Sequence, residues 1–106
     1  MALVTLPGLA ADTVLADADT AQAKLIEIIS SAQSTAANST LTVYRGTSAV
    51  AGQELWQVLL AANANGGSRV FSVLGKATIE SGVGLFLDLT DWTGRMISVA
   101  LYRSAM

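Results

Sequence analysis

Two short runs of this sequence alternate so regularly between apolar and other side chains that both are predicted to be β-strands. In Met96–Arg103, the aliphatic residues Ile97, Val99 and Leu101 occupy every second position. The run Leu41–Arg45 repeats this alternation and also ends in a tyrosine followed by an arginine. Successive side chains point to opposite sides of a strand, so each run has one apolar face and one mixed face. We expect both runs to be strands of one sandwich.

The spacing of turn signals favours an all-β fold. Glycines or small polar clusters fall near residues 8, 19, 36, 46, 52, 66, 75, 82 and 93. Turns at intervals of about 8–12 residues are typical of sandwiches and barrels. Further short alternating or apolar runs lie between them, at Ala2–Leu6, Asp12–Asp17, Arg69–Leu74, Lys76–Glu80 and Leu85–Leu89. The sequence predicts a single antiparallel, jelly-roll-like β-sandwich of about 7–8 strands.

Two segments fit a helix and a strand equally well. In Ala21–Gln33, apolar residues recur at helical spacing, but the three isoleucines are β-branched and favour a strand. As a strand, this segment places alternate residues on opposite faces: Lys24, Ile26 and Ile28 against Leu25, Glu27 and Ile29. Gln53–Ala62 is ambiguous in the same way.

Two turns are predicted from specific residues. Pro7-Gly8 is expected to close the run Ala2–Leu6. Asn63–Gly67 fits either the end of a helix over Gln53–Ala62 or a hairpin loop that returns the chain into Arg69–Leu74. The expected division is an N-terminal arm or edge strands over residues 1–20, followed by a β-sandwich domain over residues 21–106.

The sequence carries unusually little charge. Charged residues make up 13% of it, against about 25% in a typical soluble domain, and hydrophobic residues make up 52%. A domain of this size hides only about two-thirds of its extended-chain surface on folding. The remaining surface is therefore either an alanine, serine and threonine coat or a surface covered by other subunits, and we favour the second alternative.

The residues for common catalytic chemistry are missing or badly placed. The 106 residues contain no histidine and no cysteine, which excludes a Ser-His-Asp triad and a thiolate nucleophile. Asp12, Asp17 and Asp19 lack the spacing of a calcium loop, and Glu80 and Asp88 are expected on the solvent faces of strands. A net charge of −2 does not favour nucleic acid or an anionic membrane. We expect no enzyme, cofactor or metal, and no run predicts a membrane-spanning helix.

Tyrosines and tryptophans are the best candidates for contact residues. They combine a large apolar area with one polar atom, and arginines beside them can reach a partner's carboxylate. An alternative is a sugar-stacking platform, although only six aromatic residues are present and Phe71 and Phe86 are expected in the core. The predicted interface residues are Tyr44, Arg45, Trp56, Trp92, Tyr102 and Arg103.

The order of motifs resembles small all-β virion proteins of tailed bacteriophages. The resemblance covers roughly residues 20–103 and rests on these runs in this order: Ala23–Ile29, Leu41–Ser48, Gly52–Leu60, Gly66–Phe71, Gly82–Asp88 and Ser98–Tyr102. It implies that both ambiguous segments are strands. It also implies a capsid decoration (cement) protein, a head-fibre protein or a tail or head–tail accessory protein.

The expected function is therefore that of a cement protein that stabilises a capsid shell by binding between capsomers. Its expected partners are copies of itself, with a trimer as one form, and the major capsid protein or other virion proteins. Its expected location is the virion, assembled in the host cytoplasm. A tail accessory protein and a carbohydrate-binding module are the alternatives.

Overall fold

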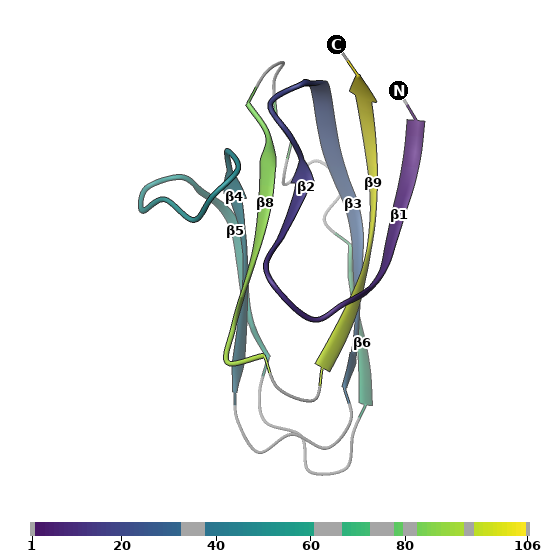
Figure 1. Ribbon diagram of the computed structural model, residues 1–106. Coiled ribbons are helices and arrows are strands. Elements are labelled where there is room, and N and C mark those ends of the chain that lie inside the picture. Colours follow the sequence, from purple (N-terminus) through teal and green to yellow (C-terminus); the bar gives the residue numbers. More distant parts are fainter. Residues whose placement is uncertain are drawn as a thin grey trace.

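The computed structural model describes residues 2–32, 38–60, 67–72, 78–79, 83–92 and 95–105 (Figure 1). Within these ranges the chain forms strands and no helix, and hence no helix long enough to cross a membrane. The nine strands are β1 Ala2–Leu9, β2 Thr13–Ala16, β3 Thr20–Ala32, β4 Ser39–Arg45, β5 Glu54–Leu60, β6 Gly67–Ser72, β7 Thr78–Ile79, β8 Leu85–Thr90 and β9 Arg95–Ala105. The predicted all-β fold is confirmed.

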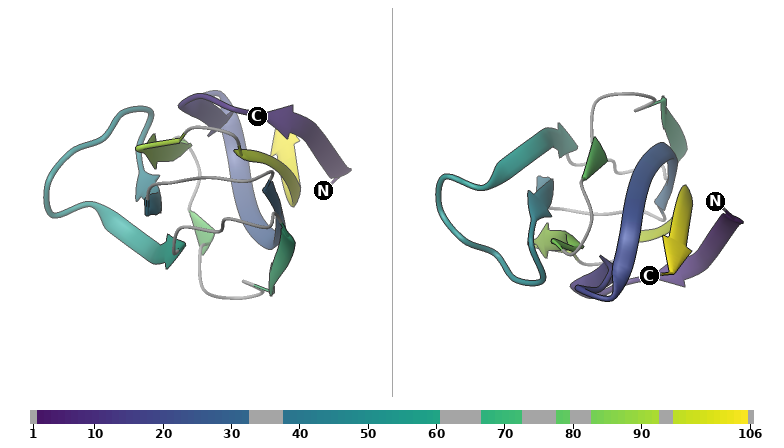
Figure 2. Two further views of the ribbon diagram at one scale, coloured as in Figure 1. Left: turned by 90° about the horizontal axis from the view of Figure 1, so that it is seen from below. Right: turned by 90° about the horizontal axis from the view of Figure 1, so that it is seen from above.

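The strands form two antiparallel sheets that pack as a sandwich (Figure 2). Sheet A has the order β1-β9-β3-β6, with the two-residue β7 also paired to β3, and sheet B has the order β2-β8-β4-β5. Four antiparallel strand pairs enclose one another in the sequence. The innermost is β4 with β5, followed outward by β3 with β6, β2 with β8 and β1 with β9. With β7 set aside, this nesting of eight strands is that of a jelly roll.

Both ambiguous segments are strands. β3 lies inside sheet A, where it pairs with β9 on one side and with β6 and β7 on the other. Its β-branched isoleucines suit this position, because stiff side chains pack well on a pleated surface between neighbours. β5 forms the outer edge of sheet B beside β4.

The predicted alternation of β3 is wrong beyond its middle, because the strand contains a β-bulge. The register with β9 shifts between Leu25 and Glu27, leaving Ile26 as the extra residue. Leu25 and Ile28 are consequently both fully buried, although regular alternation would put them on opposite faces. Relative to regular alternation, the bulge reverses the faces of Glu27, Ile28 and Ile29.

Both turn predictions are also wrong. Pro7 and Gly8 lie within β1, which continues to Leu9, and they produce a register irregularity between Leu6 and Leu9. Gly8 has a φ of 67°, a backbone conformation that glycine adopts without strain. β5 and β6 belong to different sheets, so the chain between them is a crossover and the predicted hairpin does not form.

The residues predicted as an N-terminal arm or edge strands contain β1 and β2. β1 is the outer strand of sheet A, and β2 is the outer strand of sheet B. Ala2 pairs with Arg103, so the first and last strands lie side by side (Figure 1). Within this chain, residues 2–9 therefore add to its own sheet.

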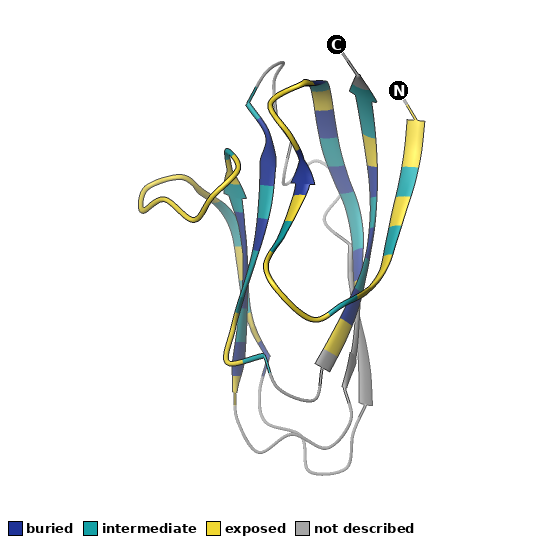
Figure 3. Cartoon of the chain, viewed as in Figure 1, coloured by how far each residue is buried: buried dark blue, intermediate teal, exposed yellow. Residues whose placement is uncertain are grey.

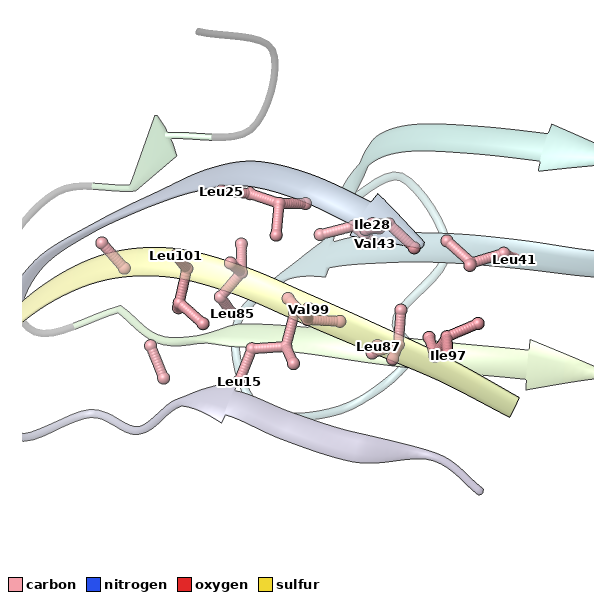
Figure 4. Close-up of a cluster of buried hydrophobic side chains, with 12 residues drawn as sticks. Leu15, Leu25, Ile28, Leu41, Val43, Leu85, Leu87, Ile97, Val99 and Leu101 are labelled. Carbon is pink, nitrogen blue, oxygen red and sulfur yellow. The ribbon is translucent and has the colours of Figure 1, made fainter. Parts of the chain in front are cut away.

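The core lies between the two sheets, and its cluster of buried hydrophobic residues is aliphatic (Figure 4). The buried bands alternate with partly exposed ones along β3, β8 and β9 (Figure 3). Burying one such side chain contributes about 1.5–3 kcal/mol. The largest fully buried side chains are Leu15, Leu25, Ile28, Leu41, Val43, Leu60, Leu85, Leu87, Ile97, Val99 and Leu101.

The prediction that Phe86 belongs to the core is wrong. Its neighbours Leu85 and Leu87 are fully buried between the sheets, so Phe86 lies on the outer face of sheet B, where it is half-buried. It pairs there with Val14 and Tyr44. The prediction for the Phe71 side chain falls outside the described residues, although the backbone register pairs Phe71 with Ile28.

Candidate functional site

The outer faces of the two sheets are the surfaces that a partner can contact, because the inner faces fill the core. Seven large hydrophobic residues are exposed among the described residues. Val14 and Leu59 lie on sheet B, and Val50 lies in the loop that projects from the sandwich between β4 and β5 (Figure 2). The other four are on sheet A: Leu3, Ile29, Met96 and Tyr102.

We call the outer surface of β1, β9 and β3 the A face. Two rows of cross-strand neighbours form its centre, each running across the three strands. One row is Leu3, Tyr102 and Lys24. The next row, two residues along β9, is Thr5, Ala100 and Glu27. The centre of the A face thus combines the apolar or aromatic residues Leu3, Tyr102 and Ala100 with Thr5, and carries one cation and one anion on its third strand.

The bulge at Ile26 brings Lys24 and Glu27 to the same face. In a regular strand, residues three apart point to opposite sides. The extra residue restores the outward direction, so Lys24 pairs with Tyr102 and Glu27 pairs with Ala100 on the outer surface of β9. Both side chains are half-buried, and no ion pair links either one to another described residue.

The outer face of sheet B is more polar and more acidic. The Gln57 Nε2 donates to the Thr42 Oγ1 at 2.9 Å, in the middle of the sheet. Tyr44 lies between Phe86 and Glu54. Burial raises the pKa of the Tyr44 hydroxyl, and the carboxylates of Asp88 and Glu54 raise it further.

Asp12 and Asp88 form a pair of carboxyl groups at the β2 edge of sheet B. The Leu89 backbone N–H donates to the Asp12 Oδ1 at 2.8 Å, which ties the segment before β2 to β8. Burial raises the pKa of Asp88, and both the charge of Asp12 and a side-chain hydrogen bond with Asp12 add to this effect. No group of three or more metal-ligating carboxylates occurs in the described part of the chain.

The six predicted interface residues do not form one surface. Tyr102 lies on the A face and is 39% exposed, whereas Tyr44 lies on the opposite side of the sandwich, on sheet B. Trp56 and Trp92 are partly buried and pack against the core. Arg45 is exposed at the end of β4.

Arg103 joins the two sheets of its own chain. It follows Tyr102 in β9, and its Nη1 donates to the backbone oxygen of Leu15 in β2 at 2.9 Å. A carbonyl of the same chain thus accepts a hydrogen bond from this guanidinium.

The buried Nε1 of Trp92 has no hydrogen-bond acceptor among the described residues. The indole ring itself packs against the core from the segment that follows β8. The structure therefore places this tryptophan mainly as a packing residue.

Sequence reasoning identified Tyr102 and the mixed face of β9, but it missed the other members of the A face. Leu3 and Thr5 join it through the pairing of β1 with β9, which is a contact between the two ends of the chain. Glu27 joins it through the bulge. The sequence held no signal that singled out this bulge, because Ile26 and Ile29 are as acceptable in a sandwich core as Leu25 and Ile28 are.

Comparisons with known proteins do not assign this chain to a family. No family model and no curated protein matches this sequence. A structure of Bacillus endospore appendages, described as a family of disulfide-linked pili, matches with a TM-score of 0.43 and 13% identity, over 99% of this chain and 84% of that chain. A likeness at this TM-score carries no argument about this chain, and the 106 residues contain no cysteine with which to form a disulfide.

Proposed function

We propose that this protein is a non-enzymatic structural subunit that acts by binding to other protein surfaces in an assembly. The observation that carries the proposal is the A face, where four of the seven exposed large hydrophobic residues of the described chain gather on one sheet. Clustered exposed apolar residues mark interaction sites more often than scattered ones do. The low charge of the whole sequence, 13%, agrees with a surface that is partly covered.

The finer proposal is a capsid decoration protein of a tailed bacteriophage, located in the virion and binding the shell at its capsomer boundaries. It is supported by the resemblance of motif order given above, and jelly rolls occur in viral capsid domains. A protein that binds only the assembled shell stabilises it by mass action and needs no chemistry. The absence of histidine and cysteine from the sequence is consistent with that role.

The carbohydrate-binding alternative is not favoured by the placement of the aromatic residues. A sugar-stacking platform needs rings that stand free on a surface. Both tryptophans instead pack against the core, and the two tyrosines lie on opposite faces of the sandwich.

The test is binding to isolated shells. The purified chain is mixed with emptied heads of the phage that encodes it, the heads are pelleted, and bound protein is measured by quantitative mass spectrometry. We expect saturable binding and, in purified virions, a copy number comparable to that of the capsid protein. A copy number that is a small fraction of this would favour a tail role. Absence from both heads and virions would overturn the proposal.

A further inference from the structure

We propose that the A face binds the A face of a second copy of this chain around a two-fold axis. The axis lies midway between the facing A faces of the two copies. It runs perpendicular to the strands, between the Tyr102 row and the Ala100 row. The inference rests on the proposed function, which it deepens by naming one partner and the surface that it contacts.

Charge complementarity points to a second copy as the occupant. Lys24 and Glu27 lie in adjacent rows of the same strand, about 7 Å apart along it. A two-fold axis between their rows makes the facing β3 strands antiparallel, so each Lys24 stands opposite the partner copy's Glu27. A two-fold contact always forms such pairs twice, because the same patch is used by both copies.

Shape complementarity follows from the same axis. On β9, the large Tyr102 of one copy stands opposite the small Ala100 of the other. On β1, the exposed Leu3 stands opposite Thr5. Two sheets pack face to face about 10 Å apart when large and small side chains interdigitate, with strand directions within about 30° of each other. The same two-fold arrangement thus places large residues opposite small ones and cations opposite anions.

The arrangement also covers the half-buried charges without leaving either unpaired. A charge enclosed in an apolar contact is costly unless an opposite charge meets it. An unrelated apolar surface packed on the A face would bring no opposite charge to Lys24 or Glu27. A two-fold contact closes on itself as a dimer, whereas the sequence-based expectation included a trimer.

Charge exchange tests the proposal directly. Lys24→Glu places two carboxylates opposite two carboxylates, and Glu27→Lys places two ammonium groups opposite two others. Each single variant is expected to self-associate at least about tenfold more weakly than the wild type. The double variant Lys24→Glu/Glu27→Lys restores both pairs and is expected to regain association. An equimolar mixture of the two single variants, one of them uniformly 15N-labelled, is expected to form the mixed dimer, which native mass spectrometry then resolves from both homodimers by mass.

A matched pair of leucines provides the control. Leu3 is 59% exposed on the A face, and Leu59 is 60% exposed on the outer face of sheet B. Leu3→Arg is expected to weaken association measured by sedimentation equilibrium, whereas Leu59→Arg is expected to leave it unchanged. Thermal melting confirms that each variant is folded.

The possible failures are distinguishable from failure of the proposed function. Association that is unaffected by the charge variants, or lost on Leu59→Arg instead of Leu3→Arg, would overturn the A face as the contact. A wild type that stays monomeric at all accessible concentrations would overturn the two-fold contact altogether. In each of these cases binding to shells would still decide the proposed function separately.

Discussion

At the scale of single residues, Arg103 connects the two halves of the sandwich through its hydrogen bond to the Leu15 oxygen. Hydrogen bonds from charged donors contribute roughly 1.5–3 kcal/mol. We expect Arg103→Met to lower the free energy of unfolding by about this amount, as measured by denaturant titration. Arg45→Met, at an exposed strand end, is the matched control and should change stability little. Equal effects of the two substitutions would mean that the bond to Leu15 does not contribute.

Asp88 is predicted to make stability fall as pH rises. Because its pKa is raised above the ordinary value of 3.8, the folded protein binds this proton more tightly than the unfolded chain does. The stabilising contribution is therefore present below 3.8 and is lost as pH rises through the raised pKa.

Asp88→Asn removes this titration and keeps a polar side chain of similar size. We expect the variant to be more stable than the wild type at neutral pH and the difference to shrink as the pH falls through the raised pKa toward 3.8. Denaturation midpoints measured across this range check it. Asp19→Asn removes one charge at an exposed turn and controls for net charge. A difference that does not vary with pH would contradict the prediction.

At the scale of elements, alternation predicted the strands whose pairing is regular and failed where a bulge intervenes. In β8 and β9, Leu85, Leu87, Ile97, Val99 and Leu101 are all buried as expected. In β3 and β1, an irregularity in register changes which side the next residue faces. A bulge depends on how the neighbouring strand fits, and a local pattern of apolar residues does not contain that information.

The register of β9 is tested by neighbouring residues. Val99 is fully buried between Leu6 and Ile28, whereas Ser98 lies on the A face. Val99→Asp is expected to unfold the domain, because an unpaired charge in the core costs several kcal/mol. Ser98→Asp is expected to leave the melting temperature nearly unchanged at protein concentrations low enough to keep the A face uncovered. Similar melting temperatures for both variants would contradict this register.

Two glycines with similar backbone conformations test how closely the chain packs just before β8. Gly84 has a φ of 96°, and a Cβ there would lie 2.7 Å from the Thr47 Cγ2 and 2.9 Å from the Ala16 oxygen. Gly52 has a φ of 90° with no atom within 4 Å of such a Cβ. We expect Gly84→Ala to destabilise more than Gly52→Ala, since it adds a backbone clash to the strain of about 1–3 kcal/mol that both share. Equal losses in denaturant titration would show that the close approach at Gly84 is relieved easily.

At the scale of the whole molecule, self-association predicts a stability that depends on concentration. Binding to the folded state alone raises its apparent stability by mass action. The melting temperature of the wild type is therefore expected to rise with protein concentration, measured by calorimetry over a hundredfold range. Lys24→Glu should flatten this dependence. A wild-type melting temperature that is independent of concentration would contradict the prediction.

The sheet order and the A face depend on contacts between distant parts of the chain, which explains why the sequence predicted only pieces of them. Alternation identified the strand that ends in Tyr102 and Arg103 as having a mixed side. Strict alternation also places Arg103 on the side of Leu101 and opposite Tyr102, but it does not show that the arginine side chain reaches the Leu15 oxygen of β2. Leu3 becomes part of the same surface only because β1 pairs with β9.

The position of β9 between β1 and β3 has a consequence for synthesis on the ribosome. Translation makes β1 early and β9 last among the described strands, so β1 has no partner in sheet A until residues 95–105 have left the exit tunnel. Until then β1 and the edge of β3 that faces β9 carry unpaired backbone groups, in a chain with few charges to keep it dispersed. We therefore expect the nascent chain to be prone to aggregation until β9 has emerged.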